Sequence, residues 1–181
     1  MQAPIDIRTI VVRVAALALL LLLILVAVLT TRSLNRLPNT LLYFVQSSET
    51  SFRLEAAPRQ LPRAQPEAHL RHTLQALIEG PTEAETARGL SSAIPETTTI
   101  LELRLRDAIV EVDVSEDFAS GGGSASMQGR LNQLFYSLTQ PSYADGVSLF
   151  IEGSPLTYFG GEGLIVDNPW RRGETTTLPS W

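Results

Sequence analysis

Residues 101–114 read LELRLRDAIVEVDV, and this stretch decides the fold. Apolar and polar side chains alternate on both sides of Asp107-Ala108, which is the pattern of two half-buried strands joined by a tight turn. A one-residue slip of the pairing would exchange the apolar and polar faces, so the register is well specified. Ala108 suits a type I′ turn poorly, which leaves open a longer turn. The predicted apolar pairs are Leu105 with Val110, Leu103 with Val112, and Leu101 with Val114, and Arg104 faces Glu111 on the other side.

Two amphipathic helix patterns flank this hairpin. The first opens at Pro66, where a missing N–H costs nothing, and ends at Gly80-Pro81. The second follows Gly121–Gly123 and ends before Pro141. Between them, Thr82 followed three residues later by Glu85 fits a capping box. The apolar stripes are Leu70, Leu74, Leu77 and Ile78 in the first helix, and Met127, Leu131, Leu134, Phe135 and Leu138 in the second.

Further short apolar segments indicate additional strands. They are Leu41–Val45, Phe52–Ala57 (ended by Pro58 and Pro62), Val147–Glu152, and Leu164–Val166 after a turn at Phe159–Gly163. We predict an α+β domain over residues 41–167, a mostly antiparallel sheet with the two helices packed on one face. The polar residues 168–181 are expected to form a loose tail.

A long apolar run precedes this domain. Val14–Leu29 is sixteen residues without a polar side chain, and with its neighbours it reaches the about 20 residues that a membrane-spanning helix needs. The run ends without an Ala-x-Ala site, so we predict an uncleaved signal anchor over residues 10–31 and a linker over 32–40. Arg8 and Arg13 precede the span and Arg32 and Arg36 follow it, so these charges do not set its orientation.

The orientation is inferred from the sizes of the two flanks instead. Residues 1–9 are too few to fold and are expected to form a short cytoplasmic tail. The domain would then lie outside the cytoplasmic (inner) membrane of a single-pass protein.

The charge and the missing residue types exclude several classes of function. Residues 38–181 carry 10 arginines and 18 acidic residues, a net charge of −8, which disfavours nucleic acid and anionic lipid headgroups. All 14 basic residues are arginine, so no lysine can form a Schiff base or hold a phosphate. The chain has no cysteine, which excludes disulfides, thiolate metal sites, a cysteine nucleophile and a lipoprotein anchor.

The carboxylates of the hairpin are one candidate for chemistry. Glu102 and Asp113 become neighbours across the two strands in the predicted register. Glycoside hydrolysis uses a pair of carboxylates about 5–9 Å apart. A charged outer strand face is, however, the normal condition of a half-buried sheet, and this reading is preferred.

Two other patterns suggest binding sites less strongly. His69 and His72 stand at i, i+3, a spacing that two metal ligands can use, yet no carboxylate lies between them, and two solvated histidines are the preferred interpretation. The Gly121–Ser124 stretch outlines an anion cradle but lacks the spaced glycines and the lysine of a P-loop. Ser124 or Ser126 is instead expected to cap the following helix. No metal or cofactor is predicted.

A set of motifs runs through the domain in a fixed order. They are Gly80-Pro81-Thr82, Gly89–Pro95 (GLSSAIP), Val110–Phe118 (VEVDVSEDF), Gly123–Ser126 (GSAS) with a helix ending LFYSLTQ at Gln140, Phe150–Gly153 (FIEG) and Phe159–Leu164 (FGGEGL). This order resembles the GerMN domain of sporulation and spore germination proteins. The resemblance implies an extracytoplasmic α+β module tethered by a lipid or a helix, similar to the ring-building motifs of envelope assemblies. It implies no catalytic residues.

These observations lead to two hypotheses of different classes. The first is a membrane-anchored, single-copy GerMN-like module, not an enzyme, that serves protein interaction or assembly in the bacterial cell envelope. Its expected partners are the membrane through residues 10–31, further copies of itself, other envelope proteins, and also peptidoglycan. The alternative is binding or hydrolysis of peptidoglycan or another envelope glycan through Glu102 and Asp113.

Overall fold

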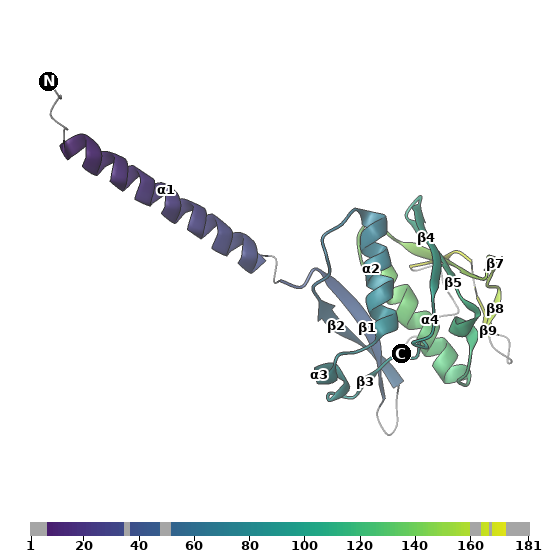
Figure 1. Cartoon of the computed structure of the whole chain (residues 1–181). Coiled ribbons are helices and arrows are strands. Elements are labelled where there is room, and N and C mark those ends of the chain that lie inside the picture. Colours follow the sequence, from purple (N-terminus) through teal and green to yellow (C-terminus); the bar gives the residue numbers. More distant parts are fainter. Residues whose placement is uncertain (1–6, 35–36, 48–51, 160–163, 167, 173–181) are drawn as a thin grey trace. The chain divides into compact units, whose positions relative to one another are not determined.

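The computed structural model describes residues 7–34, 37–47, 52–159, 164–166 and 168–172 (Figure 1). The chain divides into two compact units, residues 1–37 and residues 38–181. The first unit contains one helix, and the second contains the strands and the remaining helices.

Helix α1 spans Ile7–Leu34 and confirms the helix predicted from the apolar run. Its side chains from Ile10 to Leu29 are exposed within the unit, and Ile10–Thr30 is long and apolar enough to cross a membrane. The Thr30 hydroxyl donates to the carbonyl oxygen of Val26 at 2.9 Å, which satisfies this polar group without water.

The first sheet has the strand order β2-β1-β3, formed by Thr40–Ser47 (β1), Phe52–Arg59 (β2) and Leu90–Ser91 (β3). The prediction that Pro58 ends the second strand was wrong, since Pro58 pairs with Leu41 inside β2. An edge strand tolerates proline because the missing N–H can face away from the ladder. Pro58 is therefore compatible with the position of β2 at the edge of this sheet.

The predicted hairpin is present as β4 (Ile100–Arg106) and β5 (Ile109–Val114). Its register is confirmed from the turn as far as the pair Glu102–Asp113. The predicted pair of Leu101 with Val114 was wrong, because a bulge places Ile100 opposite Val114. The extra residue of a bulge has no partner on the facing strand. Leu101 is accordingly 46% exposed.

The turn has only two residues, shorter than Ala108 had suggested. Asp107 and Ala108 both have positive φ, 48° and 63°, as a type I′ turn requires. The left-handed conformation is unfavourable for alanine because its Cβ approaches the backbone.

Replacing Ala108 with glycine is expected to stabilise the domain. Asp-Gly suits this turn, and removal of the Cβ strain should exceed the entropy that glycine gains in the unfolded chain, raising the free energy of unfolding by about 0.5–1 kcal/mol. Urea denaturation of the full chain in detergent micelles measures the change. The matched control is Ala84→Gly on the exposed side of helix α3 (Glu83–Thr86), where the same substitution should be destabilising. A loss of stability in both variants would contradict the prediction.

A crossover joins the hairpin to the rest of the second sheet. After β5 the chain forms the 3-10 helix η1 (Glu116–Ala119) and helix α4 (Ser124–Leu138), and returns as β6 (Gly146–Ile151), parallel to β5. The sheet has the order β10-β6-β5-β4, in which β10 is Trp170–Arg171, and β7 (Ser154–Pro155) also pairs with β6. Among the described strands only β5 and β6 pair in parallel, so the sheet is mostly antiparallel, as predicted.

The two predicted amphipathic helices lie between the two sheets (Figure 1). Helix α2 (Pro66–Glu79) packs on β1, β4 and α4, and α4 also packs on β1, β2 and β6. The α+β class is confirmed, with the strands divided between sheets instead of joined in one. Helix α4 is buried over nearly its whole circumference because it has a sheet on either side. The core includes Leu42, Phe44, Leu70, Leu74, Leu103, Val112, Leu134, Leu138 and Leu149.

The end of the domain lies beyond the predicted boundary at residue 167. Trp170 and Arg171 form β10 on β6, and Trp170 is 1% exposed, so these two residues are not part of a loose tail. A Cβ on Gly146 would lie 2.5 Å from the carbonyl oxygen of Trp170, so this close pairing needs glycine. Strands β8 (Tyr158–Phe159) and β9 (Leu164–Ile165) also pair. The predicted turn between them and the tail from residue 173 lie outside the described residues.

Candidate functional site

The two hairpin carboxylates are neighbours across β4 and β5, as predicted. The Glu102 side chain is 52% exposed and forms an ion pair with Arg104 on its own strand. Both carboxylate oxygens of Asp113 accept from the Gly153 amide at 3.1 Å. Each carboxylate thus has a partner that stabilises the surface of the sheet.

The two histidines are less solvated than predicted. His69 Nε2 lies 2.7 Å from the Thr40 hydroxyl, and His72 Nδ1 is buried with no partner among the described residues. Burial lowers the pKa of His69, as does the nearby charge of His72, while a hydrogen bond to the Pro62 backbone opposes the shift. In the described ranges, no group of three His, Cys, Asp or Glu side chains is placed to hold a metal ion.

The glycine-rich loop leads into α4 in a different way than predicted. The N-cap is Gly123, without a side-chain capping bond, so the expected cap at Ser124 or Ser126 was wrong. Gly121 and Gly122 have φ values of 66° and 81°. A Cβ on Gly122 would lie 2.6 Å from the Ser126 hydroxyl, so the loop approaches the helix too closely for a side chain.

A groove of about 490 Å³ lies between this loop and the first sheet. Its volume falls in the range of about 300–1,000 Å³ that is typical of ligand pockets. Small side chains and exposed backbone line it, and no charged side chain does. The lining residues are Val45, Ser91, Ser92, Ala93, Gly123, Ser124, Ala125 and Ser126.

The side chain beneath the loop is Arg130, which is only 2% exposed. Its Nε donates to the carbonyl oxygen of Ala93 at 3.0 Å. Its Nη1 donates to the carbonyls of Phe118 and Ser120, and its Nη2 donates to that of Gly121 at 3.1 Å. One guanidinium therefore joins the loop after β3, the end of η1, and the loop before α4.

The same guanidinium lies against two aromatic rings. The Arg130 Cζ is 5.9 Å from the centroid of the Phe118 ring and 5.8 Å from that of Phe159, and the two rings are stacked at 5.6 Å. No carboxylate of the described residues pairs with Arg130, so carbonyl dipoles and ring faces stabilise its charge. Burial lowers its pKa.

Arg130 was not among the predicted site residues, although the sequence carries a signal for it. Arg130 stands three residues after Met127 and four before Leu134, on the apolar stripe of the second helix. An arginine on a buried stripe needs a set of acceptors. The acceptors of Arg130 lie in Gly89–Pro95, in Val110–Phe118 and in the loop before α4. Phe159, whose ring also contacts Arg130, begins another of the motifs. Ala93, Phe118 and Phe159 belong to three different motifs, so three of the scattered motifs meet at this side chain.

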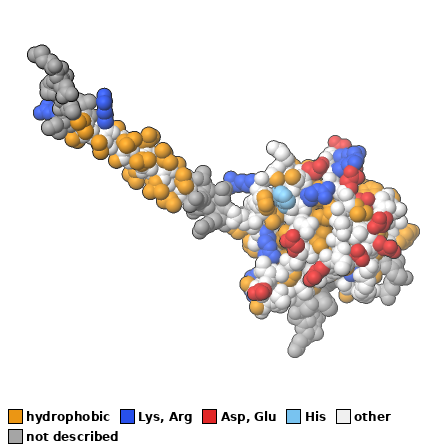
Figure 2. All heavy atoms as spheres, in the orientation of Figure 1, with side chains coloured by type: hydrophobic (Ala, Val, Ile, Leu, Met, Phe, Trp, Pro, Cys, Tyr) orange, Lys and Arg blue, Asp and Glu red, His pale blue; other side chains and the backbone are white. Residues whose placement is uncertain are grey.

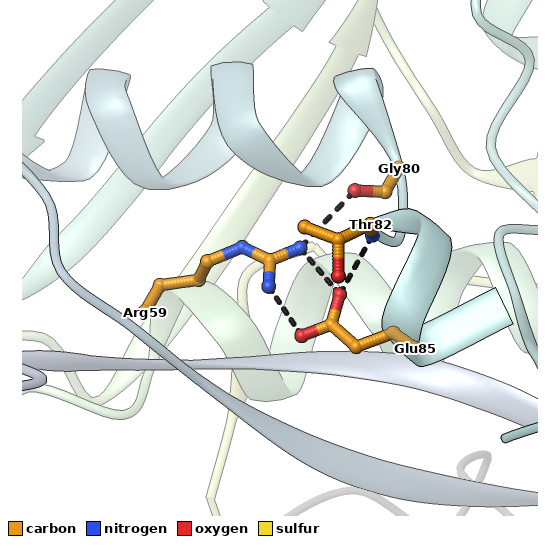
Figure 3. A network of polar contacts seen from close by, with 4 residues as sticks. All are labelled: Arg59, Gly80, Thr82 and Glu85. Atoms are coloured by element: carbon orange, nitrogen blue, oxygen red, sulfur yellow. Dashed lines mark hydrogen bonds and ion pairs between the residues drawn. The ribbon is translucent and has the colours of Figure 1, made fainter. Parts of the chain in front are cut away.

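A second buried charge holds the connection between α2 and α3 (Figure 3). Arg59, at the end of β2, forms a two-point ion pair with Glu85, in which Nη2 lies 2.6 Å from Oε2. Glu85 Oε2 also accepts from the Thr82 amide at 2.8 Å, which confirms the predicted capping box. Arg59 Nη2 reaches the Gly80 carbonyl at 3.3 Å. These contacts give the Gly80-Pro81-Thr82 motif a structural role.

The pKa of Glu85 results from opposing influences. Burial raises it, while the hydrogen bonds from Arg59 and Thr82 and the charge of Arg59 lower it. The net result is a pKa below the ordinary value of 4.5. Glu85 is therefore held ionised in the fold.

Comparisons with known proteins agree with this architecture. A family model described as "Germane: Sporulation and spore germination" matches residues 41–157. The first GerMN domain of the sporulation protein GerM from Bacillus subtilis superimposes with a TM-score of 0.59 at 18% identity, covering 75% of this chain and 100% of that chain. The tandem GerMN domains of the same protein give 0.57 at 18% identity, covering 73% of this chain and 46% of that one.

A Clostridium perfringens protein described as a candidate lipoprotein gives a TM-score of 0.54 at 18% identity, covering 73% of this chain and 85% of that chain. A comparison with curated protein sequences gives no match. At this level of identity the likeness to the solved structures is one of fold.

Proposed function

The chain belongs to the Germane family, and on that premise we propose that it is a membrane-anchored module of the cell envelope that works by binding other proteins and not by catalysis. The observation that carries the proposal is helix α1. Its 21 residues Ile10–Thr30, all apolar except Arg13 and Thr30, are covered by nothing in the described part of the chain. Burying so many exposed leucine and valine side chains in a bilayer is strongly favourable.

The sheet edges support a role in interaction. Among the described strands, β2 is an edge of the first sheet and β4 an edge of the second. Edge strands present backbone groups that can pair with another chain. Partners of this kind include a second copy and other envelope proteins. Light scattering of the purified full chain, together with crosslinking in intact cells, tests this part. A monomer without crosslinked neighbours would contradict it.

Anchoring is tested by charging the middle of the span. An arginine at a helix centre costs about 2.5–3.5 kcal/mol on insertion scales, so Leu21→Arg with Leu22→Arg should release the protein from carbonate-washed membranes. The control is Leu101→Arg, which makes the same change at an exposed residue of the domain and should leave the protein in the membrane fraction. Recovery of the unaltered chain as a soluble species lacking its first residues would show a cleaved signal instead.

The domain is proposed to lie outside the cytoplasmic membrane. Protease added to spheroplasts should then digest the domain, while protease added to intact inside-out vesicles should not. The reverse pattern would place the domain in the cytoplasm.

Peptidoglycan binding or hydrolysis is the second candidate, supported by the adjacency of Glu102 and Asp113. It ranks second because both carboxylates already have protein partners, Arg104 and the Gly153 amide. Incubation of the purified protein with peptidoglycan tests it. Release of soluble fragments that is lost in Glu102→Gln and Asp113→Asn would favour catalysis, and the absence of both release and cosedimentation would remove this candidate.

A further inference from the structure

Strand β2 has a neighbour on only one side among the described strands, and that neighbour is β1 (Figure 1). The Tyr43 amide of β1 donates to the Ser137 hydroxyl of α4 at 3.0 Å, and not to β2. Residues along an antiparallel pair alternate between bonding to the neighbouring strand and pointing their N–H and C=O groups away from it. Tyr43 faces Ala56, so the backbone groups of Ala56, and by alternation those of Leu54, point away from β1 toward the open edge.

Pro58 obeys the same alternation. It follows Ala56 by two residues, so its missing N–H belongs to the open edge and removes no bond from the ladder with β1. The open edge of β2 therefore offers complete backbone groups at Leu54 and Ala56 and ends at the proline. A strand edge of this kind can pair with another strand.

Two exposed charges flank Leu54 on this edge, Arg53 and Glu55. Among the described residues, Glu55 takes part in no ion pair. Arg53 donates to Gln46 Oε1 through Nε at 2.9 Å and through Nη2 at 2.6 Å. Its Nη1 group has no hydrogen-bond partner in the described structure, so Arg53 can hold Gln46 and still pair with a carboxylate.

Two copies of this domain need such local matching, because the domain as a whole is acidic. Residues 38–181 carry a net charge of −8, so two copies repel at long range. Acidic and basic side chains are both spread over the face of the domain that Figure 2 shows. Contact between two copies therefore depends on which individual charges meet, and not on a patch of one sign.

The charges decide the register in which two β2 strands would pair antiparallel. With Leu54 on the two-fold axis, Arg53 of each copy faces Glu55 of the other, in the positions where opposite side chains lie closest. With Arg53 or Glu55 on the axis, like charges face each other, which is destabilising. Centres nearer Pro58 bring its missing N–H into the new ladder. The register centred on Leu54 pairs both charges with their opposites and uses the complete backbone groups.

We propose that two copies of the chain pair antiparallel through β2, about a two-fold axis at Leu54, and join their first sheets into one continuous sheet. The same surface serves both copies, as a closed two-fold dimer requires. The proposal rests on the proposed binding role and deepens it, since it names a second copy as the partner of the β2 edge.

Reversal of the two charges tests the pairing. Arg53→Glu and Glu55→Arg each place like charges opposite one another twice, so each variant alone should dissociate at about tenfold higher concentration than the parent. The first variant has two acidic side chains on the strand and the second has two arginines, so an equimolar mixture should dimerise as well as the parent. Light scattering of the full chain in detergent micelles measures the mass in each case.

The double variant Arg53→Glu with Glu55→Arg is the matched control for folding and for the lost contact with Gln46. It restores opposite charges at both positions and should dimerise like the parent. A parent dimer that neither single substitution weakens, or a mixture no more associated than its components, would overturn the β2 pairing and leave self-association through another surface. A monomeric parent that crosslinks to other envelope proteins would overturn the dimer and leave the proposed binding role.

A single thiol tests the position of the axis. The chain has no cysteine, so Leu54→Cys and Leu101→Cys each carry one thiol. Paired residues that exchange backbone bonds have Cα atoms about 5.5 Å apart, so a short bis-maleimide should join two copies of Leu54→Cys. Leu101, exposed on the edge strand β4, is the control and should give little covalent dimer. A yield at Leu54 no higher than that at Leu101 would overturn the proposal.

Discussion

Replacing Arg130 with methionine is expected to lower the free energy of unfolding by about 4 kcal/mol, the range of the most damaging single substitutions. The change leaves the carbonyls of Ala93, Phe118, Ser120 and Gly121 without their donor. A buried acceptor left unpaired costs about 1–3 kcal/mol, and not all four can find water. Urea denaturation of the full chain in micelles, followed by tryptophan fluorescence, measures the loss.

Two further variants show whether the several N–H donors of the guanidinium cause this loss of stability. Arg130→Lys should restore little of the lost stability, because an ammonium group cannot reach carbonyls on several segments at once. Arg104→Met removes an exposed arginine paired with Glu102 and should cost at most about 1 kcal/mol. Hydrogen exchange should increase around residues 93 and 118–121 in the Arg130 variants. A stability close to that of the parent in Arg130→Met would refute the role of Arg130 as a structural centre.

The second large effect is expected for Glu85→Gln, a loss of about 3 kcal/mol in the free energy of unfolding. The substitution leaves Arg59 without its countercharge in a place where the arginine side chain is 17% exposed and the glutamate 8% exposed. This expected loss is at the lower end for breaking a buried ion pair, because Arg59 still donates to the Gly80 carbonyl and still lies over the Phe44 ring. The matched control is Glu83→Gln, exposed on the same short helix, which should change stability by no more than about 0.5 kcal/mol.

The pH dependence gives an independent check on Glu85. Its pKa in the fold lies below 4.5, so its contribution to stability is present above about pH 4.5 and is lost as the pH falls through the lowered pKa. The difference between the parent chain and Glu85→Gln should therefore shrink on acidification in this range. A difference that stays constant down to pH 2 would show that packing, and not the charge of Glu85, is lost in the variant.

Much of the fold could be predicted from local patterns. The hairpin register follows from alternation along residues 101–114, and the two helices follow from their apolar stripes and from Pro66 and Gly80. The two-residue turn at Asp107-Ala108 that this register assumes is present, although Ala108 left a longer turn open, because the pairing of two apolar faces overrides the poor preference of alanine for positive φ. The bulge at Leu101 was not visible, since the apolar alternation continues through it.

The candidate site was much less predictable. The sequence pointed to Glu102, Asp113, His69 and His72 by their chemistry, and the structure gives Glu102 and Asp113 partners on the sheet surface and His69 a partner in β1. Arg130 and the Arg59–Glu85 pair were missed as centres because their partners are remote in the chain. Ala93 is 37 residues from Arg130, and Glu85 is 26 residues from Arg59.

The sequence by itself determined the apolar helix, the α+β class, the hairpin and its register, because each rests on a periodicity within a short segment. Only the tertiary structure decided that β6 joins β5 in parallel, that Trp170 closes the second sheet, and that three of the motifs meet at one buried guanidinium. Such contacts depend on loops that bring distant segments together, and no local pattern encodes them. The hydrogen-bonding needs of a buried arginine are visible in the sequence, but the carbonyls that meet them are supplied by the fold.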